Sequence, residues 1–387
     1  MSAVRRAGRA FVATWRAILA DKAALLLFFI SGIVYSFFYP LPYSAETVRR
    51  VPVAIVDQDQ SALSRQMIRY VAAHPGLALA GVSTRPEAAQ ELIWRGEAAG
   101  MLVIPYDFSR KVVAGRQAEI EVGGNGAYPL LNKVALGGLA EVAGTISAGI
   151  ELKRLGAATP SGAQAAAARQ PLSVEALPLF NVREGYASYI VPGVLVLVMQ
   201  QTFLLGIGLL FGSWASARSF PYPPDTASYC GALAAFALVV ILNAMYFFGF
   251  VLWWQDYPRG GNFAGMAVLT VLFAFSVAAM GMLIGMWFRT RERSMQLLVA
   301  TSLPIMFLSG LSWPASAIAP PLRLLGWLLP STAAIQGFIA TNQMGASLRD
   351  VRVELAVLLG LTLACVALGL WRWRRGSAPA QESSAAE

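Results

Sequence analysis

The sequence is short of charged residues, and this shortage excludes an ordinary water-soluble protein. Asp, Glu, Lys and Arg make up only 13% of the 387 residues, whereas soluble domains contain roughly 25%. Hydrophobic residues account for 57%, with 20 Phe and 10 Trp. Intrinsic disorder is also excluded, because so much apolar surface has to be removed from water. The composition predicts an integral membrane protein.

Histidine and cysteine are almost absent, which argues against metal and disulfide sites. The only histidine is His74, and the two cysteines, Cys230 and Cys365, lie far apart in apolar runs. The sequence also lacks GxxxxGK[ST], GxSxG, HExxH and SxxK, so it has neither a P-loop nor a familiar hydrolase motif. We therefore expect a non-catalytic chain that binds no cofactor or metal of its own.

Six apolar stretches approach the roughly 20 residues that a membrane span needs. The first ends in Phe37-Phe38-Tyr39, a poor cleavage site, so we expect an uncleaved signal anchor. No Asp or Glu lies in the middle of a stretch, and proton-driven transport therefore has little to work with. The predicted spans are Ala23–Tyr39, Tyr189–Phe211, Tyr229–Val251, Ala264–Phe288, Met295–Trp313 and Leu355–Trp371.

The distribution of arginine and lysine predicts that both termini are cytoplasmic, because short cytoplasmic loops are richer in these residues. It also explains the net charge of +9 without a nucleic-acid partner, and we expect none. The predicted outer loops carry only Arg259, Arg323, Arg349 and Arg352. The predicted inner segments carry Arg5, Arg6, Arg9, Arg16, Lys22, Arg218, Arg289, Arg291, Arg293, Arg372, Arg374 and Arg375.

The segment 41–188 has soluble character and alternates predicted strands with helices, which indicates an inserted α/β domain with a small mixed sheet. Ser61 is the expected N-cap of its first helix, and Pro86 begins a second helix that ends near Gly96. For Asp57 and Asp59 a cap or turn role is favoured over metal binding. The predicted strands are Val51–Val56, Leu77–Val82, Met101–Ile104 and Gln117–Val122.

These patterns divide the chain into four parts. Residues 1–40 contain an interface helix and the first span, residues 41–188 the extracytoplasmic α/β domain, residues 189–376 five further spans, and residues 377–387 a disordered cytoplasmic tail. The stretch Gly156–Gln170, rich in Ala, Gly and Ser, is interpreted as a loose connection back to the membrane.

Gln200, Gln201 and Asn243 are neutral polar residues in the middle of predicted spans. They could line a substrate pathway or form hydrogen bonds with neighbouring helices, and the second interpretation is favoured. Pro304 is expected to kink the fifth span, with neighbouring helices satisfying the freed carbonyl group.

Two segments next to the spans have unusual patterns. At the N-terminus, apolar and basic residues occupy opposite helical faces, which predicts an amphipathic helix on the cytoplasmic membrane surface. It either anchors the chain to lipid or also docks a partner. After the fifth span, the proline-rich segment Pro314–Leu329 predicts short helices that dip into the outer leaflet. The N-terminal apolar face comprises Val4, Phe11, Trp15 and Ile18, and the basic face Arg5, Arg6, Arg9 and Arg16.

Four segments in order resemble permeases of ABC exporters, in the subgroup with a large extracytoplasmic domain after the first span. They are VPVAIVDQDQSALSRQ (Val51 to Gln66), GEAAGMLVIPYDFSRKVVAGRQAEIEV (Gly96 to Val122), LFNVREGYASYIVPGVL (Leu179 to Leu195) and FLSGLSWPASAIAPPLRLLGWLLPSTAAIQG (Phe307 to Gly337). The resemblance extends over almost the whole chain.

The resemblance implies a polytopic α-helical permease subunit in the bacterial inner membrane. It would pair with a second permease, identical or paralogous, and with cytoplasmic ATPase subunits that bind ATP and Mg²⁺. The extracytoplasmic domain could dock a periplasmic adaptor. The implied activity is outward movement, or efflux, of a substrate, with amphipathic drugs or lipids as the expected class. A non-transporting membrane scaffold or receptor is the alternative.

One segment departs from the family pattern. The family usually has a Glu/Arg-rich segment between the second and third spans that contacts the ATPase, whereas Gly212 to Thr226 reads GSWASARSFPYPPDT. The resemblance therefore implies a remodelled coupling contact. Its expected residues are Arg9 and Arg16 of the amphipathic helix and Trp214, Arg218, Phe220 and Tyr222 of this loop.

Overall fold

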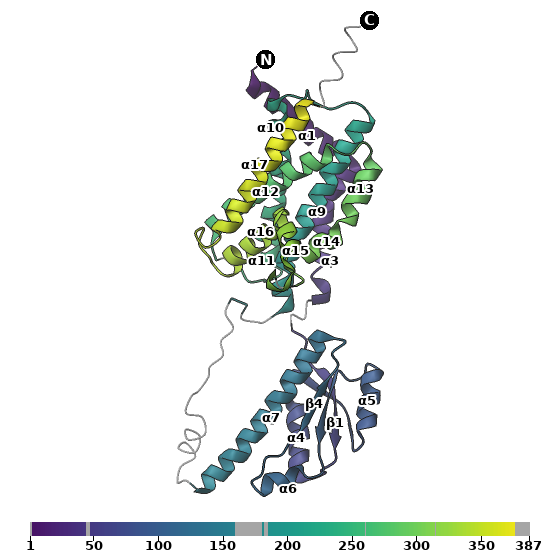
Figure 1. The fold of residues 1–387 in the computed structure, drawn as a ribbon, viewed down its shortest axis with the longest axis vertical. Helices are drawn as coiled ribbons and strands as arrows, with labels where there is room; N and C mark the ends of the chain where they lie inside the picture. The colour runs from purple at the N-terminus through teal and green to yellow at the C-terminus, as the bar shows by residue number, and fades with distance from the viewer. Residues whose placement is uncertain are drawn as a thin grey trace. The chain divides into compact units, whose positions relative to one another are not determined.

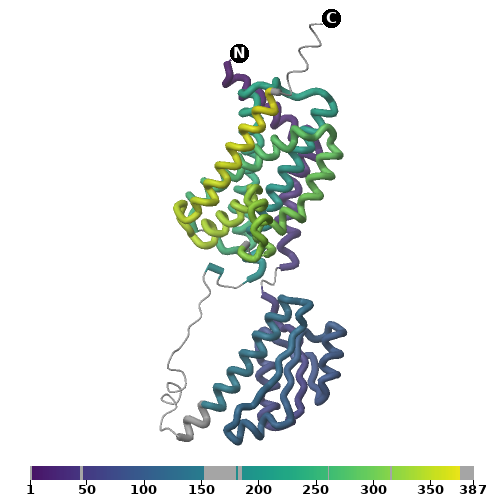
Figure 2. The backbone as a smooth tube through the Cα atoms, in the orientation of Figure 1, coloured from purple at the N-terminus to yellow at the C-terminus, as the bar shows by residue number. Residues whose placement is uncertain are grey.

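The computed structural model describes residues 2–43, 47–158, 180–181, 185–259, 261–313 and 315–375. The chain forms two compact units (Figure 1, Figure 2). The α/β unit spans Thr47–Leu177, and the helical unit combines Met1–Glu46 with Pro178–Glu387. From residue 159 onward, the predicted connection Gly156–Gln170 lies outside the described residues, as does the predicted tail 377–387.

A four-stranded sheet forms the centre of the α/β unit, in the order β2-β1-β3-β4. The three strands β2, β1 and β3 are parallel, and β4 runs antiparallel to β3. Ile55 lies opposite Val82 on one side and Leu102 on the other, and the apolar β-branched run around it is typical of a central parallel strand. The strands are β1 (Val51–Asp57), β2 (Leu77–Ser83), β3 (Gly100–Ile104) and β4 (Glu121–Gly124).

Helices cover both faces of this sheet. Met67 of α4, Phe108 of α6 and Leu139 of α7 share a core with β1 on one face, whereas Ala89 of α5 packs on the other. Successive parallel crossovers on opposite faces follow because β1 lies between β2 and β3. The helices are α4 (Ala62–Ala73), α5 (Pro86–Trp94), α6 (Phe108–Val113) and α7 (Pro129–Ala158).

The long helix α7 was not predicted from the sequence. Its segment Pro129–Glu151 is long and apolar enough to cross a membrane by length and composition alone. However, its residues Ala135, Leu139, Val142 and Ile146 are buried in the core beneath the sheet. We therefore assign α7 to the α/β unit and not to the spans.

The two aspartates after β1 have turn and cap roles, as favoured from the sequence. Asp57 accepts hydrogen bonds from the backbone N–H of Gln60 (2.9 Å) and the hydroxyl of Ser64 (2.9 Å). Asp59 accepts from the backbone N–H (3.2 Å) and hydroxyl (3.0 Å) of Ser109 in the first turn of α6. Both carboxylates are thereby committed to the local fold.

The helical unit contains most of the candidate membrane spans. Of the six found among the described residues, one is α7, and the others are in this unit. Three of them are single helices: α9 (Tyr186–Ser216), α12 (Phe263–Gly285) and α17 (Arg352–Arg375). The span Lys22–Tyr43 consists of α2 (Lys22–Leu25), η1 (Leu26–Ile30), α3 (Ser31–Phe38) and η2 (Leu41–Tyr43). The span Thr226–Trp254 consists of α10 (Thr226–Ala244), η3 (Met245–Val251) and α11 (Leu252–Trp254).

The segment Met295–Trp313, predicted as a span, is not among the candidate spans found in the described residues. It contains the second half of α13 (Arg291–Ala300) and all of α14 (Ser302–Leu308), with a break at Thr301. Pro304 lies just after the break, and because proline has no N–H, it cannot donate the hydrogen bond that would continue α13. The helix is thus interrupted close to Pro304, the residue that was expected to kink it.

The proline-rich segment that follows forms short helices, as predicted. Within Pro314–Leu329 they are η4 (Ala315–Ala317) and α15 (Pro320–Trp327). After this segment come α16 (Pro330–Phe338) and η5 (Ile339–Gln343), which continues α16. The axis bends by 86° between Pro320–Trp327 and Pro330–Gln343, the geometry of a broken span or a re-entrant loop. Pro320 and Pro330 occupy the first helical turns, where proline costs no hydrogen bond.

Candidate coupling surface at the basic end

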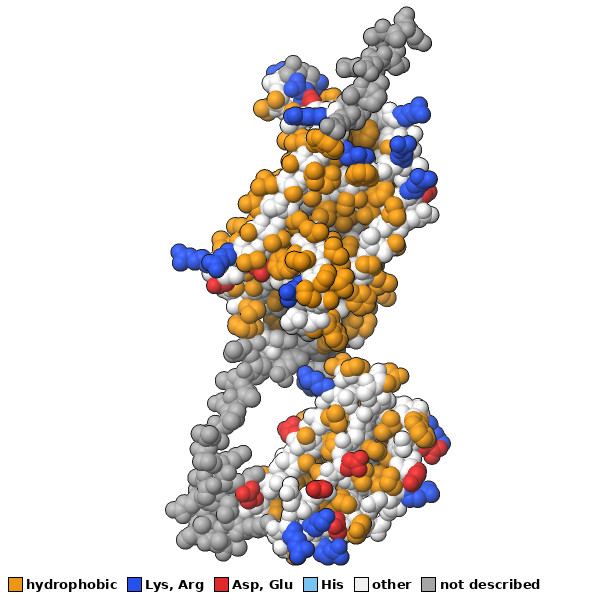
Figure 3. All heavy atoms as spheres, viewed as in Figure 1, with side chains coloured by type: hydrophobic (Ala, Val, Ile, Leu, Met, Phe, Trp, Pro, Cys, Tyr) orange, Lys and Arg blue, Asp and Glu red, His pale blue; other side chains and the backbone are white. Residues whose placement is uncertain are grey.

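Four segments of the helical unit meet at one end, which we call the basic end: α1 (Ala3–Ala20), the loop 217–225, the segment 286–290 and the C-terminal part of α17 (Figure 1). Arginine side chains gather here, as the space-filling view shows (Figure 3). The arginines of these segments and of the adjoining α13 are Arg5, Arg6, Arg9, Arg16, Arg218, Arg289, Arg291, Arg293, Arg372 and Arg374.

Helix α1 packs closely along α10. Ala10, Thr14 and Ile18 are fully buried and occupy one face of α1. A Cβ atom on Gly231 of α10 would overlap the carbonyl oxygen of Ala7, so glycine permits this close approach. The predicted amphipathic helix is present, and of its predicted apolar face only Ile18 belongs to the face that packs on α10.

Two ion pairs fix the ends of α1. Arg6 Nε lies 2.9 Å from Asp225 Oδ2, and Asp225 also caps α10 by accepting a hydrogen bond from the N–H of Ser228. At the other end, Nη1 and Nη2 of Arg291 in α13 donate hydrogen bonds to the two carboxylate oxygens of Asp21, at 2.8 and 3.1 Å. Asp21 caps α2 as well, through Ala23 and Ala24. Bidentate arginine–carboxylate pairs define both distance and orientation.

The pKa of Asp21 reflects these contacts. Partial burial raises the pKa, but the hydrogen bonds from Ala24, Arg291 and Ala23, together with the charge of Arg291, outweigh burial and leave it below the ordinary value of 3.8. The carboxylate is therefore charged at neutral pH. It contributes stability above its unfolded pKa, and this contribution is lost as the pH falls through the lower folded pKa.

The outward face of α1 forms a shallow groove of about 880 Å³. The residues that line the groove recur at three- and four-residue spacing, so they share one face of α1. At 100° per residue, this face lies opposite the buried Ala10, Thr14 and Ile18. Arg9 and Arg16, two of the predicted coupling residues, both lie on this face and are exposed. The groove is lined by Arg5, Gly8, Arg9, Val12, Ala13, Arg16, Ala17, Ala20 and Pro221.

Three of the four predicted coupling residues in Gly212 to Thr226 belong to one aromatic cluster: Trp214, Phe220 and Tyr222. The ring centroid of Trp214 lies 5.8 Å from Phe220 and 5.9 Å from Tyr222. Trp373 of α17 completes the cluster, at 5.5 Å from Phe220 and 6.0 Å from Tyr222. Edge-on and tilted ring pairs at these separations add stability beyond simple burial. The cluster thus fixes the loop 217–225 against α17.

The selected loop residues differ in exposure. Tyr222 is buried, and this burial raises the pKa of its phenol. Phe220 is 41% exposed, and Arg218 is exposed at a positive φ of 49°, where the chain turns after α9. Phe220 and Arg218 are therefore accessible to a partner, whereas Tyr222 can act only by positioning the loop.

The polar residues within the spans form hydrogen bonds inside the helical unit. The side-chain oxygen of Gln200 accepts a hydrogen bond from the N–H of Ser331, in the first turn of α16, at 2.6 Å. Gln201 donates to the hydroxyl of Ser302 (2.7 Å), and Asn243 donates to the carbonyl of Val239 in its own helix (3.0 Å). Gln200 and Gln201 thus join neighbouring helices, and the structure does not gather the three residues into one site. A role in a substrate pathway stays a prediction.

Comparison with known proteins assigns the chain to a family. A model of the ABC-2 family transporter protein matches residues 22–371, which is nearly the whole chain. The match begins just after α1 and ends within the last candidate span of the helical unit, Arg352–Arg374. No curated protein matches the sequence. The chain belongs to the ABC-2 transporter family and is a multi-pass membrane component of an ABC transporter, a family that implies an ABC ATPase as partner.

Proposed function

We propose that this chain is the permease subunit of an ABC exporter that moves an amphipathic or hydrophobic substrate outward. The observation that carries the proposal is a family match over residues 22–371 in a sequence that has no P-loop. A transporter component without a nucleotide-binding motif depends on a separate subunit to hydrolyse ATP with its Mg²⁺. The chain itself takes no catalytic part.

The proposed orientation places the basic end in the cytoplasm of a bacterial cell, at the inner membrane. The arginine-rich segments of the helical unit gather at this end, as expected for the cytoplasmic side. Both termini are then cytoplasmic, and the α/β unit is extracytoplasmic, where it is available to a periplasmic adaptor. A second permease, identical or paralogous, completes the membrane part.

We propose that the ATPase docks on two neighbouring features of the basic end. One is the groove of α1, which presents Arg9 and Arg16, and the other is the exposed part of the loop 217–225, with Arg218 and Phe220. Pro221 belongs to both features, since it lies in the loop and lines the groove. Trp214 and Tyr222 support the loop from within the aromatic cluster, so movement of the docked ATPase would be transmitted to α1, α9 and α17.

Reversing the two charges in the groove should weaken ATPase binding. A partner that binds this groove by charge complementarity presents acidic groups, and the variant Arg9→Glu/Arg16→Glu would repel them. We therefore expect at least about tenfold less ATPase to copurify. The measurement is affinity purification of the tagged chain from mild detergent, with quantitative mass spectrometry of Walker-motif proteins.

Arg323→Glu is the matched control, because Arg323 is exposed on α15, away from the basic end (Figure 1). It makes the same kind of charge reversal and should leave ATPase recovery unchanged. Equal recovery from the wild type and both variants would rule out the groove as the docking site. Failure of any ATPase to copurify with the wild type would count against the transporter function itself and favour a scaffold or receptor.

A further inference from the structure

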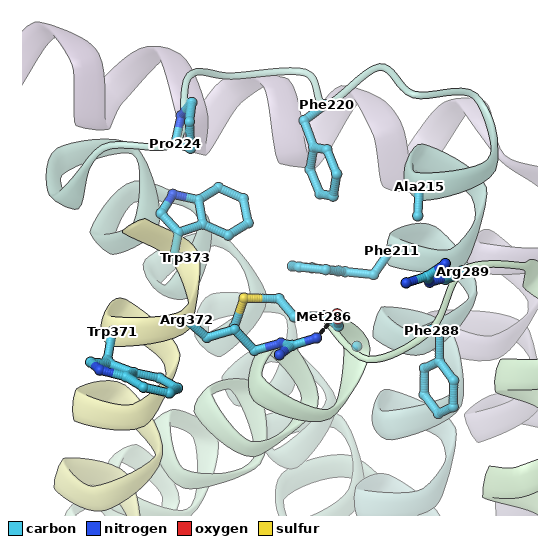
Figure 4. Close-up of a pocket in the computed structure, with 11 residues that line it drawn as sticks. Phe211, Ala215, Phe220, Pro224, Met286, Phe288, Arg289, Trp371, Arg372 and Trp373 are labelled. Carbon is cyan, nitrogen blue, oxygen red and sulfur yellow. Dashed lines mark hydrogen bonds between the residues drawn. The ribbon is translucent and has the colours of Figure 1, made fainter. Parts of the chain in front are cut away.

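A second cavity lies at the basic end, on the side of the loop 217–225 that faces α12 and α17. Its volume is about 630 Å³, within the roughly 300–1,000 Å³ of small-molecule sites. Its walls come from the end of α9, the loop, the segment after α12 and the end of α17 (Figure 4). The lining residues are Phe211, Ala215, Phe220, Pro224, Gly285, Met286, Phe288, Arg289, Trp371, Arg372 and Trp373.

Two arginines provide the charge of this cavity. Arg372 donates a hydrogen bond to the carbonyl oxygen of Met286 at 3.1 Å, and its guanidinium carbon lies 4.1 Å from the ring centroid of Trp287. Both of these partners are neutral. Arg289 is exposed, and neither arginine has a carboxylate partner among the residues that the structure describes. Two like charges without a counter-ion favour the binding of an anion.

The remaining walls are apolar and held in place by ring contacts. Phe211 is fully buried, with its ring centroid 6.0 Å from Phe220 and 6.3 Å from Trp373. Phe220 and Trp373 approach each other at 5.5 Å, edge to face. These rings form a preorganised surface, which lowers the entropy cost of binding a hydrocarbon chain. The cavity therefore combines a cationic part with an apolar part.

The cavity lies where three candidate spans end. Tyr186–Ser216, Phe263–Gly285 and Arg352–Arg374 all contribute residues from their last turns or from the segment that follows. Trp287 and Trp371, beside Arg372, are 67% and 54% exposed. Exposed tryptophans at the ends of spans are typical of the boundary between hydrocarbon and headgroups. A membrane lipid could therefore enter the cavity from the bilayer.

We propose that this cavity binds an anionic phospholipid. Its phosphate lies between the guanidinium groups of Arg289 and Arg372, and an acyl chain runs along Phe220 and Trp371, the exposed aromatic residues of the lining. The binding site is separate from the groove of α1 and shares only Phe220 with the loop part of the proposed docking surface, so lipid binding can be measured without an ATPase. The lipid would also brace α17 against the segment 286–290, because Arg372 belongs to α17 and Arg289 to that segment.

The test is native mass spectrometry of the purified full-length chain, titrated with phosphatidylglycerol, phosphatidylcholine or glycerol phosphate. We expect phosphatidylglycerol to bind at least about tenfold more tightly than phosphatidylcholine. Arg289→Gln should weaken phosphatidylglycerol binding by about tenfold, since it removes one charged hydrogen-bond donor. Ala215→Trp should abolish binding by filling the cavity. Arg293→Gln, on the exposed face of α13, is the matched control and should bind like the wild type.

Three results would overturn the proposal. The first is equal binding of phosphatidylglycerol and phosphatidylcholine, and the second is unchanged binding by both Arg289→Gln and Ala215→Trp. The third is competition by glycerol phosphate at the affinity of the lipid, which would indicate a phosphate site with no use for an acyl chain. Melting temperatures of the variants test whether they are folded, and Arg289→Gln should not lower them, because Arg289 forms no ion pair with the residues that the structure describes.

Discussion

Replacement of Gly231 by valine should release α1 from α10, so that the helix unfolds more readily and trypsin cleaves at its arginines. Any side chain at this position overlaps the backbone of Ala7, which cannot move without displacing the helix. Ala10 and Ile18 would then lose their burial. Burying an Ile side chain stabilises by about 1.5–3 kcal/mol, and 1.4 kcal/mol corresponds to a tenfold change in population. We expect cleavage within α1 of the detergent-purified chain to be at least about tenfold faster.

Gly249 provides the control for this experiment. It lies in the same candidate span, Thr226–Trp254, but a Cβ atom there would meet nothing within 4 Å. Gly249→Val has the same change in side chain and helix propensity, yet should leave α1 protected. If Gly231→Val is as resistant to trypsin as the wild type, then α1 does not depend on the close contact with α10. If the proposed docking is correct, Gly231→Val should also reduce ATPase recovery.

Breaking the pair between Asp21 and Arg291 should lower the stability of the helical unit. Asp21→Ala removes both the bidentate ion pair and the cap of α2. Hydrogen bonds to charged groups contribute about 1.5–3 kcal/mol and an N-cap about 1 kcal/mol. Because both side chains are partly exposed, we expect a combined loss of about 2–3 kcal/mol. The measurement is the melting temperature by fluorescence-detected size-exclusion chromatography.

The choice of partner variants separates the two contributions of Asp21. Asp21→Asn keeps a cap acceptor and loses the charge, so it should have a smaller effect than Asp21→Ala. Arg291→Ala and the double variant Asp21→Ala/Arg291→Ala should be far from additive if the pair is real. Arg293→Ala, on the exposed face of the same helix, should be neutral. Additive effects of Asp21→Ala and Arg291→Ala would contradict an interaction between them.

The pH dependence of this pair has a definite sign. Because the folded pKa of Asp21 lies below its ordinary value of 3.8, its contribution is complete above the unfolded pKa and disappears as the pH falls through the folded pKa. The difference in melting temperature between the wild type and Asp21→Asn should therefore be constant from about pH 8 to pH 5. It should shrink only below about pH 4.

The features that could be predicted from sequence are those with a strong local signal. Examples are the β-branched run of β1, the N-cap at Ser61 and the proline that begins α5. Each determines the conformation of residues that are only a few positions away in the sequence. Ser61 accepts the expected hydrogen bond from the N–H of Ser64, and α5 begins at Pro86. The amphipathic α1 was recognisable for the same reason, since its two faces follow helical periodicity.

The features that were missed depend on residues distant in the sequence. The buried face of α1 contains the small residues Ala10 and Thr14, because Gly231, far along the chain, allows α10 to approach closely. From the sequence, Phe11 and Trp15 belong to the apolar face predicted to lie on the membrane surface, and the contact between α1 and α10 was not predicted. Pro304 predicted a kink in the fifth span, but the position of the break at Thr301 was not predicted, because the apolar run continues through it.

The candidate site shows the same limit. The loop 217–225 was selected for its aromatic residues, but their roles could not be separated without Trp373, whose ring closes the cluster from α17. Asp21 was not selected, although a single acid between a basic helix and a span is a recognisable N-cap signal. Its partner Arg291 could be identified only from the fold.

The central claim is that the basic end receives an ATPase, and site-specific photo-crosslinking tests it most directly. A photo-reactive amino acid would replace Arg16, Phe220 or, as a control on the apolar surface of α17, Leu363, which is 61% exposed. We predict crosslinks to a Walker-motif ATPase from positions 16 and 220 and none from position 363. Crosslinks to lipid alone from all three positions, in cells where the ATPase is expressed, would contradict the account.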